Sequence, residues 1–361
     1  ADGHSKIVAR EVVEQYGDLK DSPVVGTGPW IWEETTEGVW TKLTSNPGYF
    51  EAGLPFLDEL EIKVVKPSNP RISASQEQVA AFQTDLVDLM TVPPREWRQL
   101  YASSLEFNTI LSHQAGAGLL FALNVQSAPL DDRIVRQSIF KAVDPWEYVD
   151  IIWSGQGSVG IGMPVSSPDW QLTRREMRDR YFANPSEARD VLVAEGIPIP
   201  LELDLIVADS GDIYLELARR VADNLKTAGF NAHIRALHPT HFNELLLGPG
   251  RDYQLALGPI PSATTTNGFL FSMLHSGGPG NIAGHQDRTL NAMIEEQAGE
   301  FNPERRQGQL LAIQRHVLEQ AYLFSPVSSS YRWVFDWDLK GFYPNNSLSE
   351  YHYWSQVWLE Q

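Results

Sequence analysis

The sequence predicts an α/β protein built of two lobes, and three observations lead to this prediction. The chain has 361 residues, whereas a single domain typically has ~150, so two domains or lobes are expected. Apolar residues make up 42% of the chain and charged residues 20%, which is the composition of a folded globular protein. Residues 201–237 follow the order strand, helix, strand, which is typical of a βαβ unit with a mostly parallel sheet.

The first third of the chain predicts short strands with few helices. Apolar residues recur on one face of residues 6–16, which predicts a short helix that ends at Gly17. Strict alternation of apolar and charged side chains over 60–65 is typical of a half-buried strand. The other elements expected here are strands at 30–33, 39–43 and 87–90, a helix at 76–84, and a buried strand at 119–125.

From residue 131 onward, helices and strands alternate. Asn184 followed by Pro185 is a strong helix start, because Asn caps the first turn and Pro fits the first helical position. That helix is expected to stop at Gly196. Apolar residues recur every four positions from Ile213, which predicts a helix that ends at Gly229. The further elements expected are helices at 131–142, 290–298 and 303–320, strands at 201–208 and 232–237, and a final aromatic-rich strand region.

The charge and the residue types argue against several classes of function. The chain has 28 basic and 46 acidic residues, and a net charge of −18 repels phosphate backbones, so we expect no nucleic-acid binding. There is no cysteine, which excludes thiol catalysis, iron–sulfur clusters and cysteine zinc sites. The longest apolar stretch, 116–125, is shorter than the ~20 residues of a membrane helix. The chain starts at Ala1 without signal-peptide features, so we expect that any signal peptide has been removed.

No motif predicts a catalytic, metal or cofactor site. His238 and His241 have a spacing that suits a metal on a helix, but an intervening proline and the lack of a third ligand favour a loop or a helix start. Adjacent carboxylates at 131–132 and 295–296 point apart, which favours caps and solvated helix faces. The Gly-rich run 277–280 lacks the Lys of a phosphate loop, and no Gly-x-Ser-x-Gly elbow occurs. We therefore expect no catalytic residue, no metal and no cofactor.

A series of turn and cap motifs runs through nearly the whole chain in a fixed order. It comprises Gly-Thr-Gly-Pro-Trp at 26–30, Asn-Pro-Gly-Tyr-Phe at 46–50, Gly-Leu-Pro-Phe-Leu-Asp at 53–58, and further matches at 123–124, 128–132, 135–137, 142–144, 184–189, 276–281 and 339–342. Each motif alone is common turn or cap chemistry. In this order, the motifs together resemble the extracellular solute-binding proteins of the oligopeptide and dipeptide class, solute-binding protein family 5, which serve ABC importers.

The resemblance implies a periplasmic-binding-protein-like fold of class II, with two lobes and mixed or parallel sheets. We expect the first lobe to comprise 1–122 with 334–361 and the second lobe to comprise 123–333. Members of the class carry a long stretch before the Gly-Thr-Gly-Pro motif, whereas 25 residues precede Gly26 here. We therefore expect the first lobe to be incomplete, with its N-terminal strands and a small extra subdomain absent from this chain.

A second departure from the family concerns the ligand. Peptide binders of the class place an Asp shortly after a Gly-Trp pair, where it binds the α-amino group of the ligand. The corresponding stretch here runs from Gly258 to Ser262. Ser262 is neutral, so a charge-assisted bond to an ammonium is lost. A sugar, an opine or another neutral compound thereby becomes an alternative to a free peptide.

Position in the expected fold selects the candidate ligand contacts. Trp153 follows the first helix of the second lobe, Tyr331–Trp333 lie where the chain crosses back, and Phe342 follows the last Gly turn. Packing in a core is the alternative for these aromatic residues. Asn124 either bonds the ligand or holds the backbone of the hinge, and Asn281 either bonds the ligand or holds its own loop. The complete set of candidate ligand-binding residues is Asn124, Trp153, Gly258, Ser262, Asn281, Tyr331 and Phe342.

The resemblance implies a non-catalytic binding subunit of an ABC importer. A small molecule or peptide would bind between the lobes, closure about two crossing strands would bury it, and a membrane permease would receive it. We expect a periplasmic or extracellular monomer, with a lipid anchor through the missing N-terminus as one arrangement. Two alternatives stay open, namely a hydrolase of peptides or glycans with a convergent pair of acid and base, and a sensor or chaperone-like module of the same fold.

Overall fold

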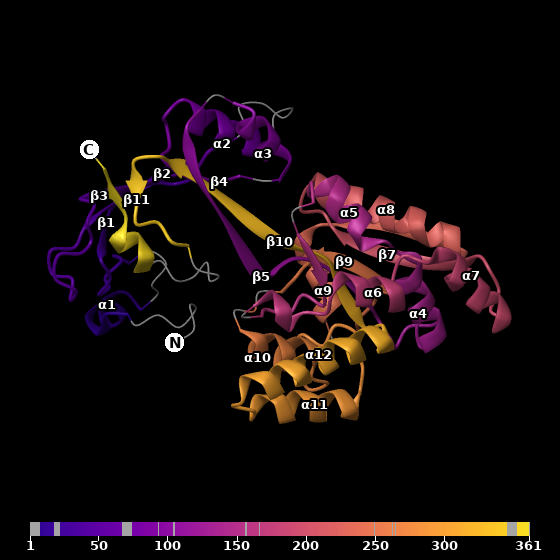
Figure 1. Cartoon of the computed structure of the whole chain (residues 1–361). Coiled ribbons are helices and arrows are strands. Elements are labelled where there is room, and N and C mark those ends of the chain that lie inside the picture. The colour runs from indigo at the N-terminus through magenta and orange to yellow at the C-terminus, as the bar shows by residue number, and fades with distance from the viewer. Residues whose placement is uncertain are drawn as a thin grey trace. The chain divides into compact units, whose positions relative to one another are not determined.

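The computed structural model describes residues 8–17, 22–66, 74–92, 94–103, 105–155, 157–165, 167–248, 250–261, 263, 265–344 and 352–360. The chain divides into two compact units (Figure 1). Unit 1 comprises Ala1–His113 with Tyr331–Gln361, and unit 2 comprises Gln114–Ser330. The strands β5 (Phe107–Leu123) and β10 (Leu323–Asp336) each run from one unit into the other. The lobe boundaries expected after residues 122 and 333 fall within these same two strands.

Unit 1 contains an antiparallel sheet and a separate group of strands and helices. β1, β2 and β3 pair in that order, and their register places Trp32, Leu43 and Leu60 side by side. No helix was predicted over 94–101. The strand predicted over 119–125 is the end of the longer β5, and the remaining predicted elements are present within a few residues. Apart from β5 and β10, the elements of unit 1 are α1 (Arg10–Tyr16), β1 (Trp30–Thr36), β2 (Trp40–Ser45), β3 (Glu59–Lys63), α2 (Ala74–Gln83), β4 (Leu89–Val92), α3 (Pro94–Tyr101), β11 (Leu339–Lys340), η3 (His352–Gln356) and β12 (Trp358–Leu359).

In unit 1, β10 carries a small core on each of its two faces. Val334 is fully buried in a cluster with Phe82 of α2 and Leu100 of α3. The next residue, Phe335, packs on the other face against Phe342, with ring centroids 5.4 Å apart. Successive side chains of a strand point to opposite faces. One strand therefore holds together two groups of elements that have no core in common.

The main sheet is mixed rather than mostly parallel. Its strands follow the order β4, β10, β5, β9, β7, β8, and β6 pairs with β10. In unit 2, β7 (Leu201–Ala208) is parallel both to β8 (Phe230–Leu237) and to β9 (Leu255–Pro259), whereas β5 is antiparallel to β9. The βαβ unit predicted over 201–237 is confirmed. The antiparallel strands could not be predicted locally, because their partners are distant in the sequence.

Helices of unit 2 begin where the sequence supplies a capping side chain. The side chain of Asn184 accepts a hydrogen bond from the backbone N–H of Glu187 at 3.1 Å, and Asp132 caps its helix in the same way. His238 caps α9, so its position is a helix start. The remaining elements of unit 2 are α4 (Arg133–Ala142), α5 (Pro145–Ile152), β6 (Ser158–Gly160), η1 (Pro168–Trp170), α6 (Arg174–Arg180), α7 (Pro185–Ala194), α8 (Asp212–Ala228), α9 (Pro239–Leu247), α10 (Thr266–Phe269), the π-helical η2 (Leu270–Leu274), α11 (Arg288–Ala298) and α12 (Pro303–Gln320).

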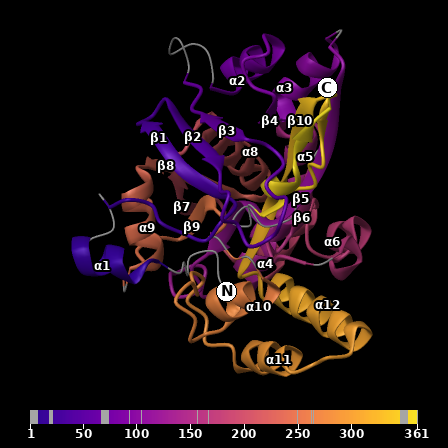
Figure 2. The same ribbon diagram turned by 90° about the vertical axis from the view of Figure 1, so that its left-hand side faces the viewer.

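The helices α11 and α12 lie side by side in both views of unit 2 (Figures 1 and 2). Two side chains of α4 bind the C-terminal end of α12. Arg136 Nε donates to the carbonyl of Gln320 at 3.1 Å, and Gln137 Nε2 donates to the carbonyl of Glu319 at 2.6 Å. The last carbonyls of a helix have no partner within the helix. The side chains of α4 therefore complete the hydrogen bonding of α12 and fix its end against the core.

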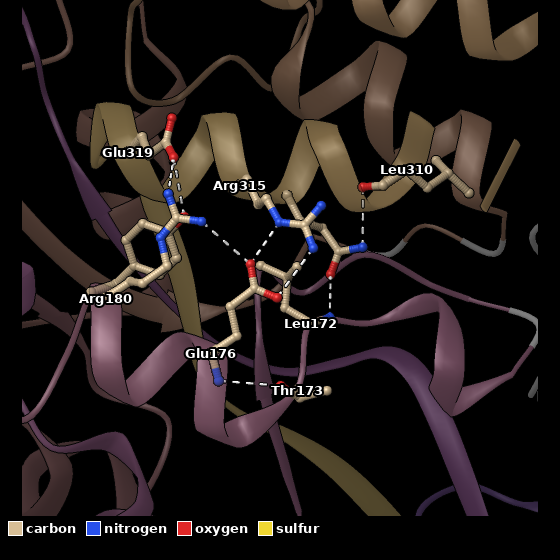
Figure 3. Close-up of polar contacts among 9 residues, drawn as sticks. Leu172, Thr173, Glu176, Arg180, Leu310, Arg315 and Glu319 are labelled. Atoms are coloured by element: carbon tan, nitrogen blue, oxygen red, sulfur yellow. Dashed lines mark hydrogen bonds and ion pairs between the residues drawn. The ribbon is translucent and has the colours of Figure 1, made fainter. Parts of the chain in front are cut away.

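A charged network joins α6 to α12 (Figure 3). Glu176 accepts two hydrogen bonds from Arg315, at 2.6 and 3.1 Å, and Arg180 forms an ion pair with Glu319 at 2.8 Å. The bonds from Arg315 lower the pKa of Glu176. These side chains are partly exposed, so each pair contributes at most about 1 kcal/mol to stability. The network mainly orients α6 against α12.

The centre of unit 2 is a cluster of aromatic rings around Phe324 of β10. The ring of Phe324 lies 5.4 Å from Phe121 of β5, 4.9 Å from Phe140 of α4 and 4.8 Å from Phe182. All four side chains are buried almost completely. Both strands that connect the units are thus anchored in the same aromatic core, which fixes their positions in unit 2.

We expect Phe324→Ala to lower the free energy of unfolding by about 3–5 kcal/mol, because it leaves a cavity among three other rings. Urea unfolding followed by circular dichroism measures the change. Phe301→Ala is the matched control, since Phe301 is 95% exposed, and it should change stability by less than about 0.5 kcal/mol. Equal urea midpoints for the two variants would contradict the role given to the aromatic cluster.

Candidate ligand-binding site

The strand directions in unit 2 indicate at which ends of its strands a ligand would bind. The parallel strands β7, β8 and β9 end at Ala208, Leu237 and Pro259. Leu119 of the antiparallel β5 pairs with Pro259, so β5 enters unit 2 at the edge where the parallel strands end. Ligands of open α/β sheets bind outside the carboxyl ends of the strands. We call this the crossing edge of unit 2.

In unit 1, too, a strand ends where a connecting strand enters the unit. β4 is antiparallel to β10, and Val92 at the end of β4 pairs with Arg332. Arg332 is the second residue of unit 1 on β10. The carboxyl end of β4 therefore lies at the edge where β10 enters, which we call the crossing edge of unit 1. Each unit thus presents carboxyl ends of strands at the edge from which its connecting strands leave.

Arg332 and Trp97 lie together at the crossing edge of unit 1. The guanidinium carbon of Arg332 is 4.1 Å from the centroid of the Trp97 ring, a cation–π contact. Its Nη1 donates a long hydrogen bond of 3.5 Å to Thr109 Oγ1, and its Nε is buried without a hydrogen-bond partner. Burial lowers the pKa of Arg332. Trp97 was not predicted as a site residue because no helix was expected there, although Pro94 with an acid two positions later, Glu96, is a helix start signal.

Two predicted ligand contacts, Gly258 and Tyr331, belong to the crossing edges by their place in the chain. Gly258 lies on β9 and pairs with Leu120 of β5, one position before the end of the strand. Tyr331 is the first residue of unit 1 on β10, and its side chain lies outside the described residues. Ser262, predicted as the neutral substitute for an acidic anchor, also lies outside the described residues.

Trp153 and Phe342 are buried in the cores of their own units. Trp153 follows α5, is 7% exposed and packs in the main core of unit 2. Phe342 is 3% exposed, and its ring lies 5.2 Å from Trp333 and 5.5 Å from Trp354. Burial of such rings stabilises the fold through the hydrophobic effect. Both side chains therefore have the packing role that the sequence analysis named as the alternative to ligand contact.

Asn124 lies at the opposite edge of unit 2, where the parallel strands begin, because β5 crosses the whole sheet before it reaches this residue. Its Nδ2 donates to the carbonyls of Arg251 at 2.8 Å and Tyr253 at 2.9 Å, and its Oδ1 accepts from the N–H of Gln126 at 3.1 Å. These residues line a polar hollow of about 600 Å³. Since both ends of the buried amide are engaged, the geometry favours the role of holding the backbone.

Asn281 holds its own loop through its Nδ2, whereas its Oδ1 is buried without a hydrogen-bond partner. Its Nδ2 donates to the carbonyls of Ser276 at 3.2 Å and His285 at 2.9 Å, and the side chain is buried. The same loop bonds the end of β5, where the N–H of Val125 donates to the carbonyl of Ala283 at 3.0 Å. Asn281 therefore lies at the edge opposite the crossing edge of unit 2. It holds its own loop, which was one of the two roles expected from the sequence.

A hollow of about 450 Å³ at this opposite edge contains an acid–imidazole cluster. Asp287 Oδ2 contacts His316 Nε2 at 2.6 Å and accepts from the Tyr322 hydroxyl at 3.0 Å, while Oδ1 accepts from the N–H of Leu290 and caps α11. Burial opposes ionisation, but these hydrogen bonds outweigh it and lower the pKa of Asp287. Both carboxylate oxygens are thus used to join α11, α12 and the start of β10.

Within the described residues, no three His, Cys, Asp or Glu side chains are grouped so that they could hold a metal ion. Of the helices described, none combines the length and the apolar character that a membrane span requires.

Comparison with known proteins identifies the family. Residues 3–281 match the family model described as "Bacterial extracellular solute-binding proteins, family 5 Middle". The chain belongs to this family. Among curated family 5 relatives, it is 25% identical to "Probable di/tripeptide-binding protein 5" of Pseudomonas aeruginosa over 312 residues, which are 84% of this chain and 56% of the relative. It is 23% identical to the glutathione-binding protein GsiB of Salmonella choleraesuis over 232 residues, which are 64% of this chain and 43% of the relative.

The family 5 fold is also found by comparison with solved structures. The crystal structure of AppA from Clostridium difficile superposes with a TM-score of 0.81 at 19% identity, over 98% of this chain and 72% of that chain. The predicted two-lobed α/β fold of a periplasmic binding protein is thereby confirmed. The chain spans about half the length of the curated relatives it matches.

Gly258 has a structural reason to be glycine, and its substitution tests the packing at the crossing edge of unit 2. A Cβ at this position would lie 2.5 Å from two ring carbons of the buried Phe242. We expect Gly258→Ala to lower stability by about 1–3 kcal/mol, because the core must shift. Gly308→Ala is the control. Gly308 lies within α12 with no atom within 4 Å of a Cβ, so this change should raise stability by about 0.5–1 kcal/mol. Changes of the same sign in urea unfolding would contradict this packing.

His285 predicts a pH dependence of stability. It is 2% exposed, stacks on Tyr322 with centroids 4.4 Å apart, and burial lowers its pKa from 6.5 to about 4. The unfolded chain therefore binds a proton between pH 6.5 and 4 that the folded chain does not bind. We expect the wild type to lose on the order of 3 kcal/mol of stability through this group as the pH falls from 7 to 4.

His285→Phe keeps a ring on Tyr322 and removes the titrating group. The free energy of unfolding of the wild type minus that of the variant should therefore decrease as the pH falls. Urea unfolding at pH 7, 5.5 and 4 measures it. Burial raises the pKa of Asp336 to about 6, which contributes a slope of the opposite sign. This slope is common to both proteins and cancels in the difference. A difference that stays constant with pH would contradict the prediction.

Proposed function

We propose that this chain is the substrate-binding part of an ABC importer, which captures a peptide or similar small solute outside the cytoplasm and passes it unchanged to a membrane permease. Membership of family 5 supports this proposal. The two curated relatives described above carry names that refer to di- and tripeptides and to glutathione. Short peptides and their derivatives are therefore the first ligands to examine.

The observation that carries the proposal is the position of the crossing edges. In each unit, the carboxyl ends of strands lie where β5 and β10 leave. We propose that the ligand binds to these edges of both units and that closure about the two strands buries it. Closure would couple binding to a change of shape that a permease can distinguish.

Binding without catalysis fits the way in which the ionisable groups are used. In the Asp287 cluster, the carboxylate caps α11 and accepts from Tyr322, at the edge opposite the crossing strands. A hydrolase would instead need an acid and a base that converge on the substrate at a crossing edge. We therefore propose that the transport energy comes from the ATPase of the importer and that this chain has no catalytic residue.

Three further features are part of this proposal and follow from the family resemblance. The complete protein would work in the periplasm or outside the cell, as a monomer, and a lipid at its N-terminus would hold it near the permease. Light scattering of the purified protein tests the monomeric state, because a dimer would double the mass of 40.5 kDa.

The proposal predicts stabilisation by an intact ligand. A thermal-shift screen of dipeptides, tripeptides, glutathione, opines and sugars should contain at least one compound that raises the melting temperature. A ligand present at 100 times its Kd adds about 2.7 kcal/mol to the stability of the folded state. Mass spectrometry of the bound fraction should then return the compound unchanged. Cleavage of a compound without stabilisation by any intact compound would contradict the binding function and favour the hydrolase.

A further inference from the structure

Within the described part of the chain, few of the hydrogen-bond donors of Arg332 have a partner. Arginine has five N–H donors and no acceptor. The Nε of Arg332 is buried without a partner, and Nη1 donates only the long bond to Thr109. Among the described residues, no acidic side chain forms an ion pair with it, and burial alone lowers its pKa. The guanidinium is therefore partly removed from water without a counter-charge in the described part of the chain.

Several other arginines of the chain have acidic partners, and the buried Arg136 donates instead to backbone carbonyls. Arg315 binds Glu176 through two hydrogen bonds, and Arg235 binds Asp204 through bonds of 3.0 and 2.6 Å. With 46 acidic and 28 basic residues, carboxylates are abundant in this chain. A partly buried charge that is left unpaired costs stability. Such a charge is characteristic of sites where a ligand supplies the missing partner.

Trp97 holds the guanidinium of Arg332 in place. The contact of 4.1 Å between the guanidinium carbon and the ring centroid occupies one face of the cation. The Trp97 ring is itself fixed by Phe107, edge to face at 6.0 Å, and by Tyr101 at 5.4 Å. A guanidinium over an aromatic ring keeps the N–H groups at its edge for a second partner. Fixing it before binding reduces the entropy that binding must overcome.

We propose that Arg332 binds a carboxylate group of the ligand at the crossing edge of unit 1, with Trp97 as its positioning residue. This inference rests on the proposed function. A carboxylate matches the fork of N–H donors and forms charge-assisted hydrogen bonds. The ligand is then a small compound that bears a carboxylate, such as a short peptide or an acylated amino acid.

Pairs of probes that differ only in the carboxylate test this proposal by isothermal titration calorimetry. Trialanine, N-acetyl-trialanine and glutathione are each compared with the corresponding carboxamide. The acid that binds best should bind the wild type about 10- to 100-fold more tightly than its amide, as expected for hydrogen bonds to a charged group. Arg332→Gln should bring the acid to the affinity of the amide and leave the amide unchanged. Arg332→Lys should recover part of the loss, since it keeps the charge without the fork.

Two further variants separate recognition from folding. Arg174 lies over the ring of Trp146 at 5.5 Å in unit 2, so Arg174→Gln removes a similar cation–π contact and should leave acid binding unchanged. Arg332→Met removes the charge and keeps an unbranched side chain for packing on Trp97. It should melt at the same temperature as the wild type or higher, and lose the preference for the acid.

Each outcome distinguishes the anchor from the proposed function. Equal affinity of the acid for wild type and Arg332→Gln contradicts the anchor and leaves the proposed function in place. A lower melting temperature of Arg332→Met with an unchanged preference for the acid also contradicts the anchor, because Arg332 would then have only a structural role. Failure of every acid and amide to bind the wild type contradicts the anchor, and it leaves the proposed function to the thermal-shift screen, which also contains opines and sugars.

Discussion

The backbone hydrogen bonds of β5 and β10 are the constraint on which the rest of this structure depends. A strand that is paired on both sides cannot shift its register without moving its side chains to the other face of the sheet. β5 is bound to β9 in unit 2, and β10 is bound to β4 in unit 1 and to β6 in unit 2. The directions of these two strands therefore decide which edge of each unit is its crossing edge and which loops lie at the opposite edge.

The two edges of unit 2 differ in how their polar groups are used. At the edge opposite the crossing strands, Asn124, Asn281 and Asp287 bond loop carbonyls, backbone N–H groups and neighbouring side chains. Such buried groups stabilise the fold only if they are paired, because an unpaired one costs its full desolvation energy. Both ends of the Asn124 amide are paired, which gives this residue a role in the scaffold, whereas Asn281 is bonded through Nδ2 and its Oδ1 is buried without a partner. Arg332, at the crossing edge of unit 1, differs from them in being a charged group: its Nε is buried without a partner, and its Nη1 donates one long bond to Thr109.

A fold of this family does not by itself specify a ligand, because function depends on the groups placed at the site. The strand ends supply a position, and the charges there supply the chemistry. In the proposal above, Arg332, which has no acidic partner among the described residues, supplies a charge for the acidic end of a ligand.

Local signals determined much of the fold from the sequence alone. The cap at Asn184, the strand over 201–208 and the helix over 303–320 were predicted closely, because hydrophobic periodicity and capping depend on residues only a few positions apart. The ordered turn motifs determined the family. The tertiary structure decided which side chains are buried and which edge of the sheet each one occupies. Trp153 and Phe342 are covered by residues far away in the sequence, and the direction of β5 takes Asn124 to the far edge. Burial and strand pairing arise from contacts between distant segments, which no local pattern of residues encodes.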